Sequence, residues 1–252
     1  MASLRPFSPV FLLTITCVLL CCFVSPSSSD DTVTMSVYYE TLCPYCADFI
    51  VNRLVKLFDT GLISIVKLRM IPWGNALIQS DGSFVCQHGP NECFLNAIEA
   101  CAITIYPDVE RHFRFIQCME RLAIENQLNQ WVNCYQIAGL AKEPAIDCYT
   151  NGHGNMIEQQ FGGETTGLSP PHRFVPWIVV NNQPLQEDFE NFVSYVCKAY
   201  TGTQLPEACQ SLPAATNSLL TENPISSVCF SDKTPNFTIS SSTIKSFTST
   251  HH

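Results

Sequence analysis

The stretch Val33-Thr34-Met35-Ser36-Val37-Tyr38-Tyr39 leads, through three further residues, into the turn Cys43-Pro44-Tyr45-Cys46. Apolar residues at every second position are typical of a strand. After the turn, apolar residues recur at helical spacing from Ile50 to Phe58, and Gly61 stands where a helix-ending glycine is expected. A second alternating run, Ile63 to Ile71, predicts another strand. Strand, turn, helix and strand form a βαβ unit, whose right-handed crossover makes the sheet partly parallel.

The middle of the chain, from about Gly74 to Gly167, is rich in cysteine and has helical periodicity, clearest over 94–105, 109–124 and 130–138. Strand character returns over 175–180, and apolar positions from Phe189 to Val196 predict a closing amphipathic helix. We therefore expect an α/β domain with a thioredoxin-like fold over residues 32–201, with a disulfide-rich helical insertion at about 74–167.

The two ends differ from this domain. Arg5, the apolar run Val10 to Val24 and the small residues after it are typical of a secretory signal peptide over residues 1–29. The alternative is an uncleaved anchor, but a span needs about 20 apolar residues. Residues 202–252 are rich in Ser and Thr and are expected to be a disordered or processed tail. Within it, Asn236-Phe237-Thr238 is a glycosylation sequon.

Composition narrows the setting and the partners. Three of the 14 cysteines lie in the predicted signal peptide, and the remaining eleven indicate disulfides formed in the secretory pathway, with at least one cysteine left over. The formal net charge of −9 argues against nucleic acid or an anionic membrane as a partner. No later run is long enough for a membrane span. We expect a secreted protein, or one delivered to a lysosome or vacuole.

The Cys43 to Cys46 turn is the candidate catalytic site. A thiol at a helix N-terminus is stabilised as the thiolate, so the pKa of Cys43 is expected below the free value of about 8.5. Cys43 would attack a substrate disulfide, and Cys46 would resolve the mixed disulfide. Tyr45 is a candidate for substrate contact. This chemistry needs disulfide-containing protein substrates and an external thiol reductant, but no bound cofactor.

A lone C-x-x-C pair has other interpretations. It can be a plain structural disulfide or half of a zinc site, for which Cys86-Gln87-His88 with Cys93 would be the nearby complement. Oxidising conditions disfavour zinc, so we expect no metal. Val175 and Pro176 strengthen the redox interpretation, because a cis-proline beside two cysteines is where thioredoxin folds bind substrate backbone. The alternative is a trans proline that begins an edge strand.

The other cysteines are expected to form structural disulfides, each contributing about 2–4 kcal/mol. Cys197 with Cys209 is a plausible local bridge, whereas the other pairings stay open, and Cys229 in the tail could link two precursor chains. Glu92 and Glu99 show no arrangement that suggests acid–base work, and His88 and His172 have the surroundings of loop residues. The candidates for structural disulfides are Cys86, Cys93, Cys101, Cys118, Cys134, Cys148, Cys197 and Cys209.

Three segments resemble the gamma-interferon-inducible lysosomal thiol reductases, the GILT family. They are 37–46 with the cysteine turn, 86–101 with the pattern Cys86-Gln87-His88-Gly89-Pro90-Asn91-Glu92-Cys93 followed by Asn96, Glu99 and Cys101, and Pro170-Pro171-His172 followed by Val175-Pro176-Trp177. The resemblance implies a thioredoxin-like fold and reduction of protein disulfides at acidic pH. It also implies that Cys43 forms the mixed disulfide, that Cys46 resolves it, and that a precursor is trimmed at both ends.

Two alternative functions stay open from the sequence. A disulfide oxidase or isomerase would use the same fold, and Pro44-Tyr45 does not fix the reduction potential that separates it from a reductase. A redox-silent, disulfide-braced secreted binding module would simply bridge its cysteines. Loss of disulfide reduction in a Cys43→Ser variant separates the enzymes from the binding module.

Overall fold

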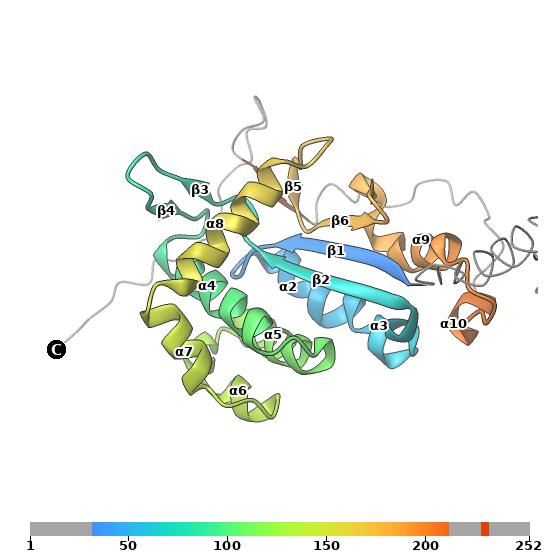
Figure 1. Cartoon of the computed structure of the whole chain (residues 1–252), viewed down its shortest axis with the longest axis horizontal. Helices are drawn as coiled ribbons and strands as arrows, with labels where there is room; N and C mark the ends of the chain where they lie inside the picture. The colour runs from blue at the N-terminus through green and yellow to red at the C-terminus, as the bar shows by residue number, and fades with distance from the viewer. Residues whose placement is uncertain (1–31, 212–227, 232–252) are drawn as a thin grey trace, which may run out of the picture. The chain divides into compact units, whose positions relative to one another are not determined.

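The structure is a computed structural model that describes residues 32–211 and 228–231 (Figure 1). The predicted signal peptide and the sequon at Asn236 lie outside the described residues. Of the predicted tail, residues 202–211 and 228–231 are described and contain a short helix and a short strand. These two segments therefore differ from the expected structureless tail; disulfides at Cys209 and Cys229 tie them to the domain.

A four-stranded sheet forms the centre of the domain, with the order β2-β1-β6-β7 (Figure 1). β1 (Val33–Tyr39) pairs in parallel with β2 (Val66–Pro72) and antiparallel with β6 (Trp177–Val180). β6 then pairs antiparallel with β7 (Gln183–Pro184). The predicted βαβ unit and the return of strand structure near residue 177 are confirmed, and the topology is the expected thioredoxin-like α/β fold.

One nearly continuous helical run connects β1 to β2. It comprises α2 (Pro44–Asp48), the π-helical segment η1 (Phe49–Leu54) and α3 (Lys56–Asp59). Gly61 follows with a left-handed backbone (φ 72°), as expected for a residue that ends a helix. Leu62–Ile65 then forms the 3₁₀ turn η2, so the second strand begins at Val66 rather than at Ile63. The buried Leu62 and Ile65 anchor this turn in the core, a tertiary effect that alternation alone does not show.

The insertion is helical, as predicted, except at its start. A small hairpin of β3 (Leu77–Ile78) and β4 (Phe84–Val85) precedes the helices, and its two-residue strands are too short to give an alternating pattern. The remaining elements are α4 (Pro90–Ile105), α5 (Val109–Ile124), the 3₁₀ turn η3 (Leu128–Gln130), α6 (Asn133–Ile137), α7 (Glu143–Thr150) and α8 (His153–Thr166).

The C-terminal part completes the sheet and covers it. β5 (Phe174–Val175) precedes β6, and the β6–β7 hairpin turns at Asn181 and Asn182, both with positive φ. The predicted closing helix is split into the 3₁₀ turn η4 (Gln186–Asn191) and α9 (Phe192–Ala199). Two short elements follow, α10 (Glu207–Gln210) and β8 (Cys229–Phe230), and β8 pairs antiparallel with β5.

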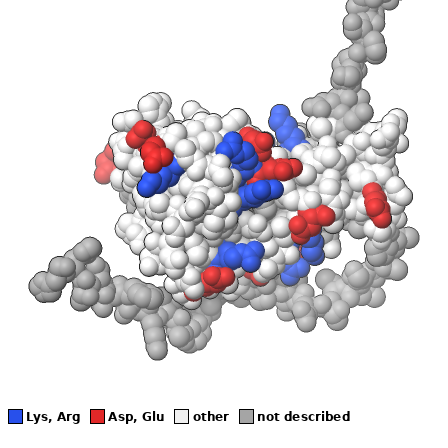
Figure 2. All heavy atoms as spheres, turned by 90° about the horizontal axis from the view of Figure 1, so that it is seen from below, with Lys and Arg blue, Asp and Glu red and all other residues white. Residues whose placement is uncertain are grey.

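Charged side chains are sparse on one face of the molecule. On the face shown in Figure 2, basic and acidic side chains lie intermixed on a mostly uncharged surface. Among the described residues, no helix has both the length and the apolar character needed to cross a membrane.

Candidate active site

Cys43 is the residue immediately before α2 and caps it. Its sulfur accepts a hydrogen bond from the backbone N–H of Cys46 at 3.4 Å, and Pro44 occupies the first helical turn, where a missing N–H costs nothing. Leu42, just before it, has a left-handed backbone (φ 68°), which is uncommon for a branched side chain and turns the chain sharply into the helix. The helix start is thus aimed at the Cys43 sulfur, as the spacing of the two cysteines predicts.

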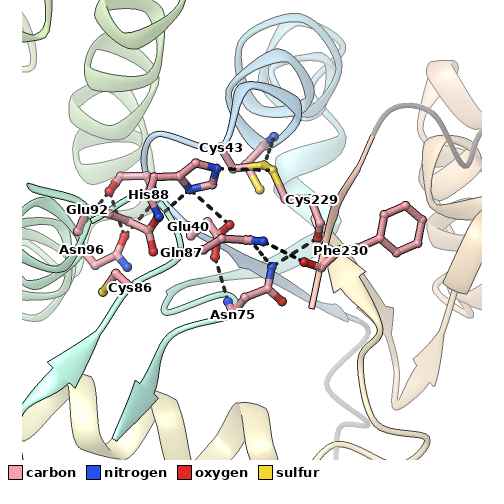
Figure 3. A network of polar contacts seen from close by, with 12 residues as sticks. Glu40, Cys43, Asn75, Cys86, Gln87, His88, Glu92, Asn96, Cys229 and Phe230 are labelled. Atoms are coloured by element: carbon pink, nitrogen blue, oxygen red, sulfur yellow. Dashed lines mark hydrogen bonds and ion pairs between the residues drawn. A yellow bond between two sulfur atoms is a disulfide. The ribbon is translucent and has the colours of Figure 1, made fainter. Parts of the chain in front are cut away.

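Cys43 is bonded to Cys229, with the two Cα atoms 6.4 Å apart (Figure 3). Cys46 is the one free cysteine in the described part of the chain and is fully buried. The two cysteines expected to act as a pair are therefore not bonded to each other here. No local pattern predicts a bond between Cys43 and Cys229, because they are 186 positions apart in the chain and Cys229 lies in a two-residue strand.

The strand pairing explains how Cys229 reaches Cys43. Phe174 pairs with Phe230 and Val175 with Cys229, and the N–H of Ser231 donates to the carbonyl of Arg173 at 3.0 Å. The Val175–Pro176 peptide bond is cis, the isomer that the sequence analysis favoured. Cys229 thus lies on an extended segment that runs beside the residue preceding the cis-proline.

The first two turns of α4 hold the segment that precedes Cys43. The side-chain oxygen of Asn96 accepts hydrogen bonds from the N–H of Thr41 at 2.9 Å and from its hydroxyl at 3.0 Å. The Thr41 hydroxyl also lies 3.2 Å from the carbonyl of Glu92. All three residues are buried, so the segment before Cys43 is fixed by side chains rather than by a strand.

His88 lies between two carboxylates and the disulfide (Figure 3). Its Nδ1 is 2.6 Å from Glu92 Oε2, which also accepts the backbone N–H of His88 at 2.7 Å. Glu40 Oε1 is 3.6 Å from the same Nδ1. The other ring nitrogen, Nε2, faces Cys229 Sγ at 4.0 Å. Since Glu92 orients the ring, Nε2 is held toward the sulfur that is bonded to Cys43.

Glu40 is buried beneath this site and is held by the chain after β2. The N–H of Asn75 donates to Glu40 Oε2 at 2.7 Å. Gly74 has a left-handed backbone (φ 59°), and a Cβ there would overlap the Glu40 side chain. Glycine is therefore required at position 74 for both its backbone conformation and its lack of a side chain.

Cys46 is a buried free thiol. Burial raises its pKa well above the ordinary value, and the negative charge of Glu40 raises it further, while a backbone hydrogen bond at Glu40 acts in the opposite direction. Cys46 must therefore lose its proton before it can attack a disulfide, and Glu40 is a carboxylate close to it.

Three more carboxyl groups are buried in the same domain, on α4, α5 and α8: Glu99, Glu120 and Glu158. Burial raises the pKa of each one, to about 8 for Glu99, which accepts a hydrogen bond from the Tyr39 hydroxyl at 2.5 Å. The sequence did not predict that Glu99 would lie buried with two further carboxyl groups; whether Glu92 or Glu99 takes part in acid–base work stays a prediction. The missed signal is that Glu92, Asn96 and Glu99 recur at helical spacing on the buried face of α4.

Comparison with known proteins decides the family. The family model described as gamma interferon inducible lysosomal thiol reductase (GILT) matches residues 34–138. A gamma-interferon-responsive lysosomal thiol protein of Arabidopsis thaliana is 37% identical over 202 residues, covering 77% of this chain and 84% of the relative. A gamma-interferon-inducible lysosomal thiol reductase of Mus musculus is 35% identical over 193 residues, covering 74% and 75%.

This chain belongs to the GILT family. It is a thiol–disulfide oxidoreductase and acts on disulfide-containing substrates. Among solved structures, the reduced form of a disulfide bond oxidoreductase (DsbG) from Mycobacterium tuberculosis has a TM-score of 0.48 and 19% identity, and the match covers 76% of this chain and 89% of that chain.

The eight candidates for structural disulfides form four bonds in this GILT protein. The pairs are Cys86–Cys93, Cys101–Cys148, Cys118–Cys134 and Cys197–Cys209. Because Cys86 and Cys93 are bonded, neither offers a thiolate to the zinc site considered above. Glu40, His88 and Cys229 are close enough together to hold a metal ion, but the Cys229 sulfur is also in a disulfide.

The candidates for substrate contact differ in exposure. Tyr45 is exposed in the turn, whereas Val175 and Pro176 are buried where β8 runs beside them. His172 lines a cavity of about 290 Å³ together with Trp73, Asn75 and Ser231. This cavity adjoins the segment that carries Cys229.

Proposed function

We propose that this GILT protein reduces disulfide bonds of protein substrates at acidic pH, with Cys43 as the attacking cysteine and Cys46 as the resolving one. One observation carries the proposal. Cys43 is bonded to the sulfur of an extended segment that pairs with the strand before cis-Pro176, and the free thiol of Cys46 lies in the next turn of chain. This is the arrangement that a mixed disulfide with a substrate requires.

The first step is attack by the Cys43 thiolate on one sulfur of the substrate disulfide. The substrate S–S bond breaks, a bond forms between Cys43 and that sulfur, and the other substrate sulfur leaves with the electron pair and takes up a proton. The N–H of Cys46, which donates to Cys43 Sγ at 3.4 Å, stabilises the attacking anion.

The second step is attack by Cys46 on Cys43 Sγ. Cys46 gives up its proton, with Glu40 as the acceptor, the Cys43–Cys46 bond forms, and the bond from Cys43 to the substrate sulfur breaks. That sulfur leaves with the electron pair and also takes up a proton. The substrate has then gained two electrons and two protons, and an external small thiol or dithiol reduces the Cys43–Cys46 bond for the next cycle.

His88 is assigned as the proton donor to the departing substrate sulfur. In the structure Cys229 occupies the place of that sulfur, 4.0 Å from His88 Nε2. Glu92 accepts from Nδ1 at 2.6 Å and so fixes which nitrogen faces the sulfur. A protonated imidazole at this place prevents the departing thiolate from attacking Cys43 again, because a thiol is a far weaker nucleophile than a thiolate.

An acidic endomembrane compartment suits this chemistry and this fold. The names of two relatives contain the word lysosomal, and the N-terminal sequence is typical of a signal peptide. Glu99, Glu120 and Glu158, whose pKa values burial raises, are neutral in the folded protein at acidic pH, where they carry no cost of burying a charge. We therefore place the mature protein in the secretory pathway, outside the cell or in a lysosome or vacuole, with Asn236 as a glycan acceptor.

The decisive experiment compares the wild-type protein with three variants in reduction of insulin disulfides between pH 4 and pH 7, with a small thiol as reductant. Cys43→Ser is expected to lose activity by at least about a hundredfold, because no other sulfur occupies the helix start. Cys46→Ser is expected to accumulate a mixed disulfide with the substrate that a non-reducing gel detects and excess reductant removes. A Cys118→Ser/Cys134→Ser protein, with the bond in the insertion removed, serves as the control and should keep the activity while it remains folded.

The same measurements separate the alternatives. Activity retained in Cys43→Ser contradicts the proposed role of Cys43. If the wild-type protein reduces nothing in this pH range, the redox-silent binding module is supported. If it instead oxidises reduced substrates or rearranges scrambled ones faster than it reduces them, the protein is an oxidase or isomerase with the same fold.

A further inference from the structure

We propose that the C-terminal segment Val228–Ser231 is an internal substrate, which occupies the peptide-binding surface of the enzyme and covers Cys43 until a thiol opens the Cys43–Cys229 bond. The inference rests on the proposed function of Cys43 and concerns the regulation of the same site. We call the binding surface the peptide strip and define it as β5, Asn75 and Gln87. Its preferred partner is an extended, cysteine-containing segment.

The first support is the combination of a covalent bond with strand pairing. Cys229 is bonded to Cys43 and lies opposite Val175, while Phe230 lies opposite Phe174. The N–H of Ser231 adds a hydrogen bond to the carbonyl of Arg173 at 3.0 Å. Backbone pairing with a strand edge is a general way to bind an extended peptide, since it does not depend on the peptide sequence.

The second support is a pair of side chains that bind the backbone of the segment (Figure 3). The Asn75 amide donates to the carbonyl of Cys229 at 3.2 Å, and the Gln87 amide donates to the carbonyl of Phe230 at 2.9 Å. Asn75 also donates to the Gln87 side-chain oxygen at 2.8 Å, which orients both amides. These donors bind two successive backbone carbonyl groups of the segment.

One side chain of the segment adds a preference. The Phe230 ring packs edge-on against Phe174, with centroids 6.2 Å apart and planes at 76°. Edge-to-face aromatic pairs are worth about 0.5–1.5 kcal/mol beyond the area that they bury. The peptide strip should therefore favour substrates in which a large aromatic residue follows the cysteine.

The segment leaves no room for a second peptide at the sulfur. With Cys229 in place, Cys43 is 0% exposed, and Cys229 itself is buried. The cavity of about 290 Å³ beside Ser231, lined in part by Trp73, Leu77 and His172, remains open. A longer substrate can reach this cavity, but its cysteine reaches Cys43 only after the segment has left.

Two reactions can open the Cys43–Cys229 bond. Attack of Cys46 on Cys43 Sγ forms the Cys43–Cys46 bond and releases Cys229, which takes up a proton; the protein is neither oxidised nor reduced overall. Alternatively, two molecules of an external thiol reduce the bond, giving free thiols on Cys43 and Cys229 and one molecule of the small disulfide. Only after either reaction can the segment leave the peptide strip.

The first test is disulfide mapping of the full-length oxidised protein after acid quenching and alkylation. The expected result is a peptide pair joined through Cys43 and Cys229, with Cys46 alkylated, in a protein that runs as a monomer on a non-reducing gel. A Cys43–Cys46 bond with alkylated Cys229 would overturn the proposal, and so would a dimer linked through Cys229.

The second test is kinetic and uses insulin at about 0.1 mM with limiting reductant. A tethered group has an effective concentration in the millimolar range, so Cys229→Ser is expected to start about tenfold faster than the wild-type protein. Phe230→Ala should fall between the two, because the segment keeps its cysteine but loses the aromatic contact, and Phe230→Tyr, which keeps the ring, should resemble the wild type. Equal initial rates for all four proteins would contradict an occupied peptide strip.

The outcomes for the internal substrate and for the proposed function are distinguishable. Retained activity in Cys43→Ser contradicts the function, whatever the mapping shows. An active wild-type protein with no bond to Cys229 contradicts only the proposal of an internal substrate.

A peptide experiment tests the aromatic preference. A synthetic peptide Ser227-Val228-Cys229-Phe230-Ser231, supplied as a mixed disulfide with a small thiol, should be reduced by Cys229→Ser several-fold faster than the same peptide with Ala in place of Phe230. Equal rates would contradict the aromatic preference.

Discussion

Tyr38 and Tyr39 are neighbours on β1 and point to opposite faces of the sheet, and each donates a hydrogen bond to a carboxyl group. Tyr38 donates to Glu164 at 2.8 Å, and Tyr39 to Glu99 at 2.5 Å. Burial opposes ionisation of Glu164, but hydrogen bonds from Arg69 and Tyr38 outweigh it and lower its pKa. Burial raises the pKa of Glu99 to about 8, because within the described residues no cation pairs with it.

The comparison shows that one partner decides the charge of a half-buried or buried carboxyl group. Arg69 binds both oxygens of Glu164, at 2.8 and 2.7 Å, and keeps it ionised. On the Tyr39 side the chain buries several carboxyl groups close to the sulfur chemistry, and His88 is the basic group that contacts two of them, Glu40 and Glu92. The stability of the Tyr39 side, which includes the active site, is therefore expected to be greatest at low pH. The Tyr38 side is not expected to share this dependence.

The largest expected effect is a loss of stability with rising pH on the Glu99 side. Below the unfolded pKa of about 4.5 both states are protonated, and Glu99 contributes no difference. Between 4.5 and about 8 the unfolded state ionises while the folded state keeps the proton, so stability falls by on the order of 1 kcal/mol per pH unit for each such carboxyl. Glu120 and Glu158 act in the same direction, whereas His112, whose pKa burial lowers, acts in the opposite direction at low pH.

Urea unfolding at pH 4.5, 6 and 7.5 measures this slope. The Glu99→Gln side chain cannot ionise, so this variant should reduce the slope by the contribution of one carboxyl group. Glu164→Gln should leave the slope unchanged between pH 4.5 and 7.5. A carboxyl group with a lowered pKa loses its stabilising effect only at lower pH. Stability that rises from pH 4.5 to 7.5 would contradict the assignment of neutral buried carboxyl groups.

The next effect concerns His88 on the same side. His88→Asn is expected to slow reduction of an alkyl disulfide by about a hundredfold, at the low end for the loss of a general acid. The loss should shrink for an aromatic disulfide whose thiol leaves readily without a proton. His153→Asn, at an exposed helix start, is the matched control. A loss of equal size for both substrates would assign His88 a structural role instead.

The smallest effect should appear on the Tyr38 side. Arg69 and Glu164 have side chains that are 41% and 33% exposed, so water screens their attraction. Arg69→Met is expected to cost no more than about 1 kcal/mol of the free energy of unfolding, because Glu164 can be hydrated when it loses its partner. Disulfide reduction per folded molecule should not change. A cost above about 3 kcal/mol, the range for breaking a buried ion pair, would show that Arg69 and Glu164 are shielded from water as fully as the carboxyl groups on the Tyr39 side.

Much of the fold follows from the sequence because it depends on local patterns. The alternation in Val33–Tyr39, the helical spacing of α4 and α5 and the glycine at position 61 each predict the observed element. The β3–β4 hairpin was missed because its strands are too short to show a period.

The candidate site was predictable only in part. Cys43, Cys46 and Pro176 are marked by local motifs, whereas the partners of His88 and the bond to Cys229 arise from contacts between segments far apart in the chain. Burial of Glu99, Glu120 and Glu158 depends on how three helices of the insertion pack, and a single sequence does not determine that packing.

The sequence separation of 186 between Cys43 and Cys229 also imposes an order on biosynthesis. The four other bonds span between 7 and 47 residues and can close as soon as their own segments have entered an oxidising compartment. The bond at the active site must wait until almost the entire chain has been translated. Cys43 consequently spends the period of synthesis exposed to every nascent thiol before its final partner arrives.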